Sequence, residues 1–270
     1  MVNNFSRSSA MPMNNSLNKA FSLLNHFTID KDVIGLSELS RLSGMPKATV
    51  YRLMTTMEEN GFIRKVNIIG RDNQYRLGLK FLELGKLVSE QLEIREVALP
   101  YMKNLRDKVN ECVQLIVRDE NDAIYIEKLE VDRPVRLYTR VGRRAPLYGG
   151  ACPRAILSFM EDEEIERILK TKQLEAITSN TIIDEVSLFK SIEEARKTGY
   201  TVSYGELELD SAAVGAPIFD NQGKVIASIS IAGPEFRFKD KEMTFLTAEL
   251  LKTTFQISQK FGYKKPQVTR

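Results

Sequence analysis

Cysteine and histidine are scarce in this chain of 270 residues, which contains only Cys112, Cys152 and His26. Two cysteines cannot form the dense disulfide framework of a small secreted domain, and such scarcity suits a reducing cytoplasm. A zinc finger needs closely spaced Cys and His ligands, which three residues spread between positions 26 and 152 cannot supply. We therefore expect a cytoplasmic protein with no bound metal and no cofactor.

Long apolar segments are also missing. No stretch approaches the ~18 consecutive apolar residues of a membrane span, so we expect no integral membrane protein and no membrane partner. Residues 1–16 (MVNNFSRSSAMPMNNS) lack the apolar core of a secretory signal and have the composition of a mobile arm. Hydrophobic residues (43%) and charged residues (28%) are in the range of ordinary globular proteins, and the length predicts about two domains.

Positive charge is concentrated in the first third of the chain. Residues 1–80 contain 11 Lys and Arg against 6 Asp and Glu, whereas residues 81–270 contain 28 against 30. An excess of one sign in one part of a chain is typical of a polyanion-binding module joined to a second domain. On charge alone, an uneven distribution of solvated surface residues remains the alternative.

The same first third has the apolar spacing of three helices. Apolar residues recur with a helical period over 17–27. Ser37 is a candidate N-cap for a short second helix, which Gly44 ends. Pro46 suits the first position of a third helix, because no helical hydrogen bond needs its missing N–H there. Gly61 follows that helix, where a left-handed C-cap is expected.

A short β-hairpin is predicted after the third helix. The segments 62–66 (FIRKV) and 74–78 (QYRLG) flank a polar loop, and the second segment alternates apolar with polar residues. Three helices followed by a hairpin give the order of a winged helix-turn-helix, which we expect over residues 17–78.

The third helix has the two faces that a DNA-reading helix needs. Its apolar stripe, expected to face the core, consists of Val50, Leu53, Met54 and Met57. On the opposite face, small residues allow close approach to the major groove, hydroxyls bind phosphates, and basic side chains bind guanine edges. Basic residues of the hairpin suit phosphates or a minor groove. The alternative is a small helical domain with a solvated basic face. The candidate DNA-binding residues are Ser37, Pro46, Lys47, Ala48, Thr49, Arg52, Thr55, Arg64, Lys65, Arg71 and Arg76.

The rest of the chain predicts an α+β domain. A helix over 79–99 suits a linker or a partner surface, and Pro100 restarts or kinks a helix that continues to Val109. The later strands and helices do not alternate regularly, which favours an antiparallel sheet over a doubly wound one. Expected strands cover 113–117, 124–126, 135–141, 200–204, 213–219 and 224–231. Expected helices cover 155–160, 161–170, 187–197 and 239–261, with a loop at 142–154 and a hairpin turn at 220–223.

Four segments resemble the IclR family of bacterial transcriptional regulators. LSELSRLSGMPKATVYRLMTTMEENGFIRK (36–65) is similar to the family's DNA-binding segment, and YRLGLKFLELG (75–85) to its wing-to-linker segment. VGRRAPLYGGACPRAIL (141–157) and ELELDSAAVGAPIFDNQGKVIASISIAGP (206–234) resemble two segments of the family's second domain. The four segments stand in the family's order, and the resemblance extends from about residue 17 to residue 261.

The resemblance implies a sequence-specific regulator, expected to be a repressor of a catabolic operon, whose partner is a double-stranded DNA operator. It implies a linker helix at 79–99, a GAF-like effector-binding domain at 100–263 and a tail at 264–270. It also implies that copies of the chain assemble into a homodimer or tetramer, which suits two half-sites on one face of DNA.

By the same resemblance, a small organic-acid effector binds between the loop around 137–154 and the sheet of 200–232. Arg140, Arg143 or Arg144 could pair with its carboxylate, although a solvated surface charge is the alternative for each. The chain departs from the family's pattern at Pro153, Arg154 and Ala213, so no particular effector is transferred. The candidate effector-binding residues are Leu137, Arg140, Gly150, Ala151, Cys152, Ser203, Glu206, Ser211, Ala213, Ser230 and Ala232.

Two other functions remain as alternatives. An enzyme with a Ser-His-Asp site would need His26, which is predicted in the first helix of the DNA-binding unit, and the phosphate-binding pattern GxxxxGK[ST] does not occur. We therefore expect no enzyme and no catalytic residues. In the second alternative, the C-terminal domain only oligomerises. Cys112 is expected in the core, and Cys152 either in the pocket or in the helix core.

Overall fold

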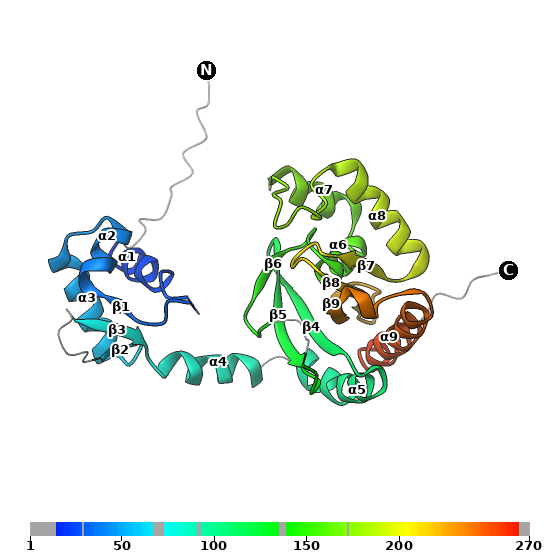
Figure 1. Cartoon of the computed structure of the whole chain (residues 1–270), viewed down its shortest axis with the longest axis horizontal. Coiled ribbons are helices and arrows are strands. Elements are labelled where there is room, and N and C mark those ends of the chain that lie inside the picture. The colour runs from blue at the N-terminus through cyan, green and yellow to red at the C-terminus, as the bar shows by residue number, and fades with distance from the viewer. Residues whose placement is uncertain are drawn as a thin grey trace, which may run out of the picture. The chain divides into compact units, whose positions relative to one another are not determined.

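A computed structural model describes residues 15–28, 30–66, 73–90, 93–134, 139–171 and 173–264. The chain forms two compact units, Met1–Gln91 and Leu92–Arg270 (Figure 1). The predicted arm lies outside the described residues except for its last two positions, which begin the first helix instead. Arg71, Leu137 and the tail beyond residue 264 also lie outside them.

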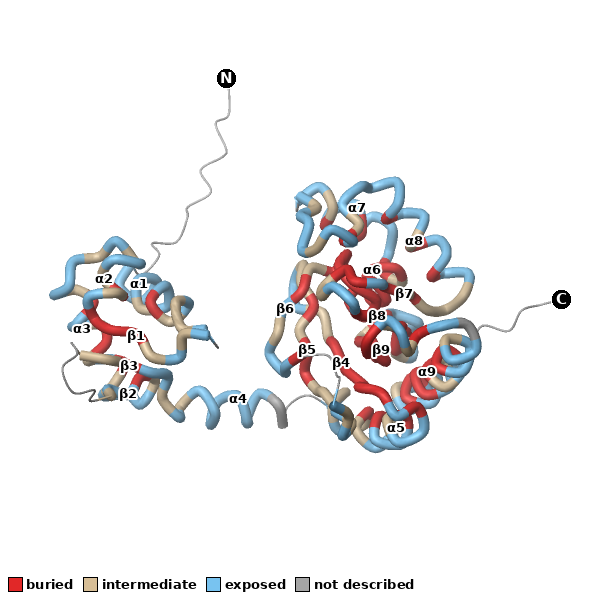
Figure 2. Tube along the Cα trace, in the orientation of Figure 1, coloured by how far each residue is buried: buried red, intermediate tan, exposed pale blue. Residues whose placement is uncertain are grey.

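The first unit is a winged helix-turn-helix, as the sequence predicts. Its helices are α1 (Asn15–Leu24), α2 (Leu36–Ser43) and α3 (Lys47–Glu59), and its strands are β1 (Ile34–Gly35), β2 (Ile63–Val66) and β3 (Gln74–Leu77). The strands form an antiparallel sheet in the order β1-β3-β2. Side chains from all these elements meet in one core, drawn in red in Figure 2, which includes Leu23, Leu39, Val50, Met54 and Tyr75.

Two predicted helix starts in this unit are displaced. Ser37 does not cap α2, because the chain leaves strand β1 directly into the helix and Gly35 occupies the N-cap position. Pro46 is the N-cap of α3 rather than its first helical residue, and its carbonyl accepts hydrogen bonds from the N–H groups of Thr49 (2.9 Å) and Val50 (3.1 Å). Strand β1 itself is too short for an alternating pattern to predict.

The predicted helix at 79–99 is two helices in the described ranges. Helix α4 covers Lys80–Glu90 and α5 covers Glu93–Val109, with Pro100 inside α5. Ala98, Met102 and Leu105 of α5 are buried in the core of the second unit. Residues 93–99, assigned to the linker from the sequence, therefore begin the first helix of the second unit.

The second unit is built on a six-stranded antiparallel sheet in the order β6-β5-β4-β9-β8-β7, in agreement with the predicted α+β class. The strands are β4 (Cys112–Asp119), β5 (Asp122–Leu129), β6 (Arg144–Pro146), β7 (Thr201–Tyr204), β8 (Ser211–Phe219) and β9 (Val225–Pro234). The helices that follow α5 are α6 (Ala151–Ser158), α7 (Asp162–Thr171), α8 (Glu185–Thr198) and α9 (Asp240–Lys260), with a short 3-10 turn at Glu235–Arg237.

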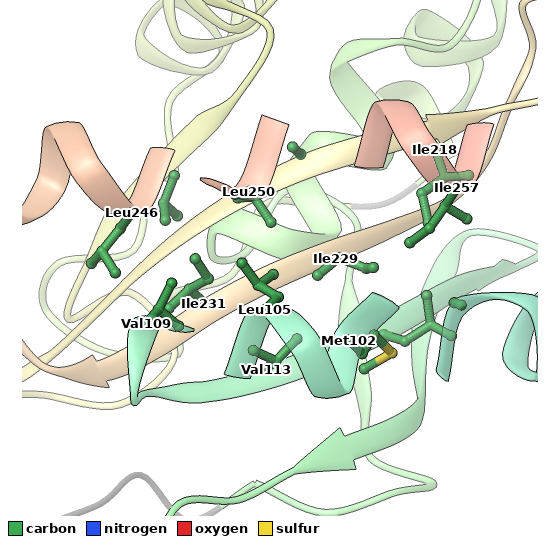
Figure 3. Packing of buried hydrophobic residues seen from close by; sticks show 14 of the residues in the cluster. Met102, Leu105, Val109, Val113, Ile218, Ile229, Ile231, Leu246, Leu250 and Ile257 are labelled. Atoms are coloured by element: carbon green, nitrogen blue, oxygen red, sulfur yellow. The ribbon is translucent and has the colours of Figure 1, made fainter. Parts of the chain in front are cut away.

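The two faces of this sheet pack against different helices. Helices α5 and α9 cover one face, where apolar side chains of β4, β8 and β9 meet Leu105 and Leu250 (Figure 3). Helices α6, α7 and α8 cover the other face with a second apolar cluster. Because side chains alternate along a strand, strands β4, β5, β8 and β9 supply residues to both clusters.

The segment 142–154, predicted as a loop, contains β6 and the start of α6. Helix α6 begins at Ala151, four residues before the predicted helix, because Pro153 is tolerated in a first turn that needs no N–H donor. The strand predicted at 135–141 is not formed at residues 139–141, and its other residues lie outside the described ranges.

Gly215 brings α6 close to the sheet. A Cβ atom at this position in β8 would lie 2.8 Å from the carbonyl carbon and oxygen of Ala151. The first turn of α6 therefore lies directly on strand β8. No helix in the described ranges is long and apolar enough to cross a bilayer.

Candidate nucleic-acid interface and ligand cavity

Helix α3 separates its apolar and polar residues as predicted. Val50 and Met54 are fully buried, Met57 is nearly so, and Leu53 packs against the same core. On the opposite side, Lys47, Ala48 and Arg52 are exposed, and Thr49 and Thr55 are half-buried. Pro46 is exposed at the N-cap of α3, and Ser37 is exposed in the first turn of α2. The polar face is thus open to solvent within the first unit.

The end of α3 orients the hairpin. Gly61 adopts φ +77°, and the N–H groups of Gly61 and Phe62 donate to the carbonyls of Glu58 and Met57, both at 2.9 Å. This is the Schellman motif that the Asn60-Gly61 pair predicts. The chain therefore reverses at once into β2.

The hairpin places two arginines opposite each other. Arg64 of β2 and Arg76 of β3 are register partners, and both side chains are exposed. Like charges directly opposite on a sheet repel each other and destabilise the pair. In the described part of the chain, Lys47, Arg52, Arg64, Lys65 and Arg76 make no ion pair with an acidic side chain. A surface of this kind suits a polyanion such as the phosphate backbone of DNA.

The second unit contains a cavity of about 40 Å³ between the first turn of α6, the sheet and the segment 205–210. Eight predicted effector residues line it: Gly150, Ala151, Cys152, Ser203, Ser211, Ala213, Ser230 and Ala232. Glu206 is buried but outside the cavity wall, and Arg140 is exposed and does not line the cavity. The remaining candidate, Leu137, lies outside the described residues.

Sequence reasoning missed five lining residues, and it named a sixth, Arg143, only as one of three candidate partners of a carboxylate. The five missed residues are Gln114, Tyr125, Thr139, Leu207 and Glu208. Gln114 could have been found, because it stands between Val113 and Leu115 and must therefore point to the other side of strand β4. Thr139, Leu207 and Glu208 belong to irregular segments, for which no periodicity predicts an orientation.

Arg143 is the cation of the cavity. Its Nη1 lies 2.6 Å from Oε1 of Glu208, and its guanidinium carbon lies 6.0 Å from the centre of the Tyr125 ring. The neighbouring Arg144 instead points to the outer surface, where its Nη2 lies 2.8 Å from Oδ2 of Asp119. Of the three arginines that the sequence suggests as partners of an effector carboxylate, Arg143 is therefore the one that lines the cavity.

Apart from the Arg143–Glu208 pair, the polar groups of the cavity are neutral. Burial raises the pKa of Tyr125, so the phenol keeps its proton. Burial also raises the pKa of Cys152 to about 12, and its Sγ lies 3.2 Å from Oγ of Ser228. A thiol with such a pKa is a poor nucleophile at neutral pH. Gln114 accepts a hydrogen bond from Ser230 (3.2 Å). Among the described residues, no three His, Cys, Asp or Glu side chains converge on a metal site.

A buried ion pair lies behind the cavity wall. Arg154 of α6 and Glu206 form two hydrogen bonds, from Nη1 to Oε2 (2.5 Å) and from Nη2 to Oε1 (2.8 Å), and both side chains are almost fully buried. Glu206 also accepts from the N–H of Gly150 (3.2 Å). Arg154 further donates to the carbonyls of Tyr148 (3.2 Å) and Val202 (2.6 Å). This pair fastens the segment 205–210 to the start of α6.

Comparisons with known proteins identify related sequences over nearly the whole chain. Residues 86–259 match the profile "Bacterial transcriptional regulator IclR C-terminal", and residues 16–67 match the "IclR helix-turn-helix domain". The chain is 48% identical over 250 residues to the HTH-type transcriptional regulator KipR of Bacillus subtilis (strain 168), covering 93% of this chain and 98% of that protein. It is 28% identical over 249 residues to the transcriptional repressor IclR of Escherichia coli (strain K12), covering 92% and 90%.

A solved structure supports the same relationship. The crystal structure of an IclR homolog complexed with 4-hydroxybenzoate from Microbacterium hydrocarbonoxydans matches with a TM-score of 0.77 at 26% identity. The match covers 91% of this chain and 98% of that one. These findings confirm the resemblance drawn from the four sequence segments.

We expect Glu206→Gln to lower the free energy of unfolding of the second unit by about 3–5 kcal/mol, because it leaves the buried Arg154 without a counter-charge. Glu193→Gln, an identical change on the exposed face of α8, should alter it by less than about 0.5 kcal/mol. Urea unfolding followed by circular dichroism measures both values. Equal stability of the two variants would contradict a structural role for the ion pair.

Proposed function

Because the chain belongs to the IclR family of bacterial transcriptional regulators, we propose that it represses a catabolic operon and releases its operator when a small carboxylic acid binds the cavity. The exposed polar face of α3, opposite an apolar stripe that packs into the core, carries this proposal. Repression follows by similarity to the transcriptional repressor IclR of Escherichia coli. Coupling between the two sites of about 1–3 kcal/mol, transmitted through residues 79–99, would suffice.

For the operator, α3 is proposed to enter the major groove. Lys47, Ala48 and Thr49 at its first turn bring small and donor groups to the DNA, and Arg52 lies one turn further along the same face. Arg64, Lys65 and Arg76 of the hairpin are proposed to bind phosphates or a minor groove.

For the effector, the cavity offers one arginine, paired with Glu208, among neutral hydroxyl, amide and phenol groups. Such a lining suits a small organic anion, because Arg143 can form two parallel hydrogen bonds with a carboxylate. The complex of a structural relative with 4-hydroxybenzoate, itself a carboxylate, supports the same chemical class.

A second copy of the chain is the proposed partner of α4. Leu82 (72% exposed), Leu87 (55%) and Val88 (59%) present apolar surface on this helix within the described unit. An apolar helix surface of this extent requires a covering partner. A two-fold dimer would also present two α3 helices to successive half-sites, and two such dimers would make a tetramer.

Arg52→Ala is expected to weaken specific operator binding by about 1–3 kcal/mol if Arg52 contacts a base edge. Fluorescence anisotropy with operator and scrambled duplexes at several salt concentrations measures the effect. Lys190→Ala, an exposed basic residue of α8, serves as the control. Equal binding by wild type and Arg52→Ala at every salt concentration would remove Arg52 from the interface.

Small carboxylates should raise the melting temperature of the protein and release it from operator DNA. At 100 times its dissociation constant, a ligand of the native state adds about 2.7 kcal/mol of stability. Arg143→Gln should abolish both effects, whereas Arg144→Gln, whose side chain pairs with Asp119 outside the cavity, should preserve them. If no metabolite changes either the melting temperature or operator binding, the domain only oligomerises.

Replacing Leu82 and Leu87 by Glu should convert the dimer into a monomer, because the paired surface would then bury four unpaired carboxylates per two chains. Size-exclusion chromatography with light scattering measures the mass. Val186→Glu, at an equally exposed apolar residue of α8 (81%), provides the control. A double variant with the mass of wild type would place the interface elsewhere.

A further inference from the structure

Glu208 occupies the position that a ligand carboxylate would take. Its Oε1 lies 2.6 Å from Nη1 of Arg143, and both residues line the cavity. The Arg143 side chain is 23% exposed, so its charge is partly removed from water, and a carboxylate beside it offsets part of this cost. Glu208 supplies this carboxylate.

The volume of the site argues that Glu208 must move when a ligand binds. The cavity holds about 40 Å³, whereas a single water needs about 10–15 Å³ by the same measure. The site is partly open to solvent, and its interior has room for a group the size of a carboxylate and little more. A larger acid enters fully only if a side chain of the wall leaves.

The contacts of the segment 205–210 favour Glu208 as the group that leaves. The Glu206 side chain is fixed by Arg154 and Gly150, and its carbonyl accepts a hydrogen bond from Oγ1 of Thr181 (2.8 Å). The main chain of Glu208 is also held, since its carbonyl accepts from Oγ of Ser211 (2.5 Å). Its side chain, by contrast, is 34% exposed, so a rotation returns the carboxylate to water without moving the main chain.

We propose that Glu208 is an internal stand-in for the effector's carboxylate. In the empty site it neutralises Arg143, and an incoming carboxylate takes its place on the guanidinium while Glu208 turns to solvent. The charge of the site is the same before and after this exchange. The inference rests on the proposed effector site and adds its mode of ligand entry.

Acetate and its neutral analogue acetamide test this exchange without knowledge of the natural effector. Cys152 lines the cavity, so its modification by methyl methanethiosulfonate, which the raised pKa of the thiol makes slow and which is therefore followed over long incubations, reports access to the site. Mass spectrometry of tryptic peptides follows it, because Cys152 falls in peptide 145–154 and Cys112 in peptide 109–118. The full-length wild type is compared with Glu208→Gln, Glu208→Ala, Arg143→Gln and the control Glu193→Gln.

Acetate should halve the rate of Cys152 modification at a concentration about ten times lower in both Glu208 variants than in wild type or Glu193→Gln. A tenfold change corresponds to about 1.4 kcal/mol. Acetamide should protect none of the proteins, and acetate should not protect Arg143→Gln.

Two results would overturn the exchange. The first is an equal half-protecting concentration of acetate in wild type and in both Glu208 variants. Acetate would then still bind the effector site, but it would not compete with Glu208 for Arg143. The second is an absence of protection in every protein. The proposed regulatory function fails on a separate measurement, namely operator binding that no carboxylate changes.

Discussion

The buried pair of Arg154 and Glu206 is the interaction on which the ligand cavity depends. It joins the first turn of α6 to the segment 205–210, two parts of the chain that are far apart in sequence. Buried ion pairs often add little net stability compared with apolar packing, but they fix one arrangement because any other leaves a charge unpaired. Here the arrangement keeps Leu207 close to Gly150 in the wall of the cavity, since a Cβ atom at Gly150 would lie 2.7 Å from Cδ1 of Leu207.

The sheet of the second unit divides two tasks between its faces. Toward α5 and α9, β8 and β9 present Val214, Ile229 and Ile231 to a continuous apolar core. Toward α6, the same strands present small and polar residues such as Gly215 and Ser230, which leave space for a ligand. The closely packed core on one face of the sheet thus supports a polar cavity on the other face. Because such a core is hardly compressible, it resists displacement of the strands when a ligand fills the cavity.

The sequence predicted those features that repeat along the chain. The stripe of α3, the glycine that ends it, and the hairpin of β4 and β5 all follow from local periodicity and turn chemistry. The site residues on regular elements were predicted largely because the family resemblance aligned them. Arg143 and Glu208 lie in irregular segments, and their pairing depends on how 142–150 and 205–210 meet in space. Local sequence patterns contain no information on which irregular segments lie side by side, so these residues of the cavity wall could be identified only from the structure.

The opposed arginines of the wing have a consequence for the response to ionic strength. Mutual repulsion between Arg64 and Arg76 is relieved in the free unit when mobile ions shield it. The same ions compete with the protein for phosphates, and affinity for a duplex falls steeply as they accumulate. Added electrolyte therefore stabilises the unbound hairpin but weakens the complex with DNA. At low ionic strength, the repulsion within the hairpin and the affinity for the duplex are both at their greatest.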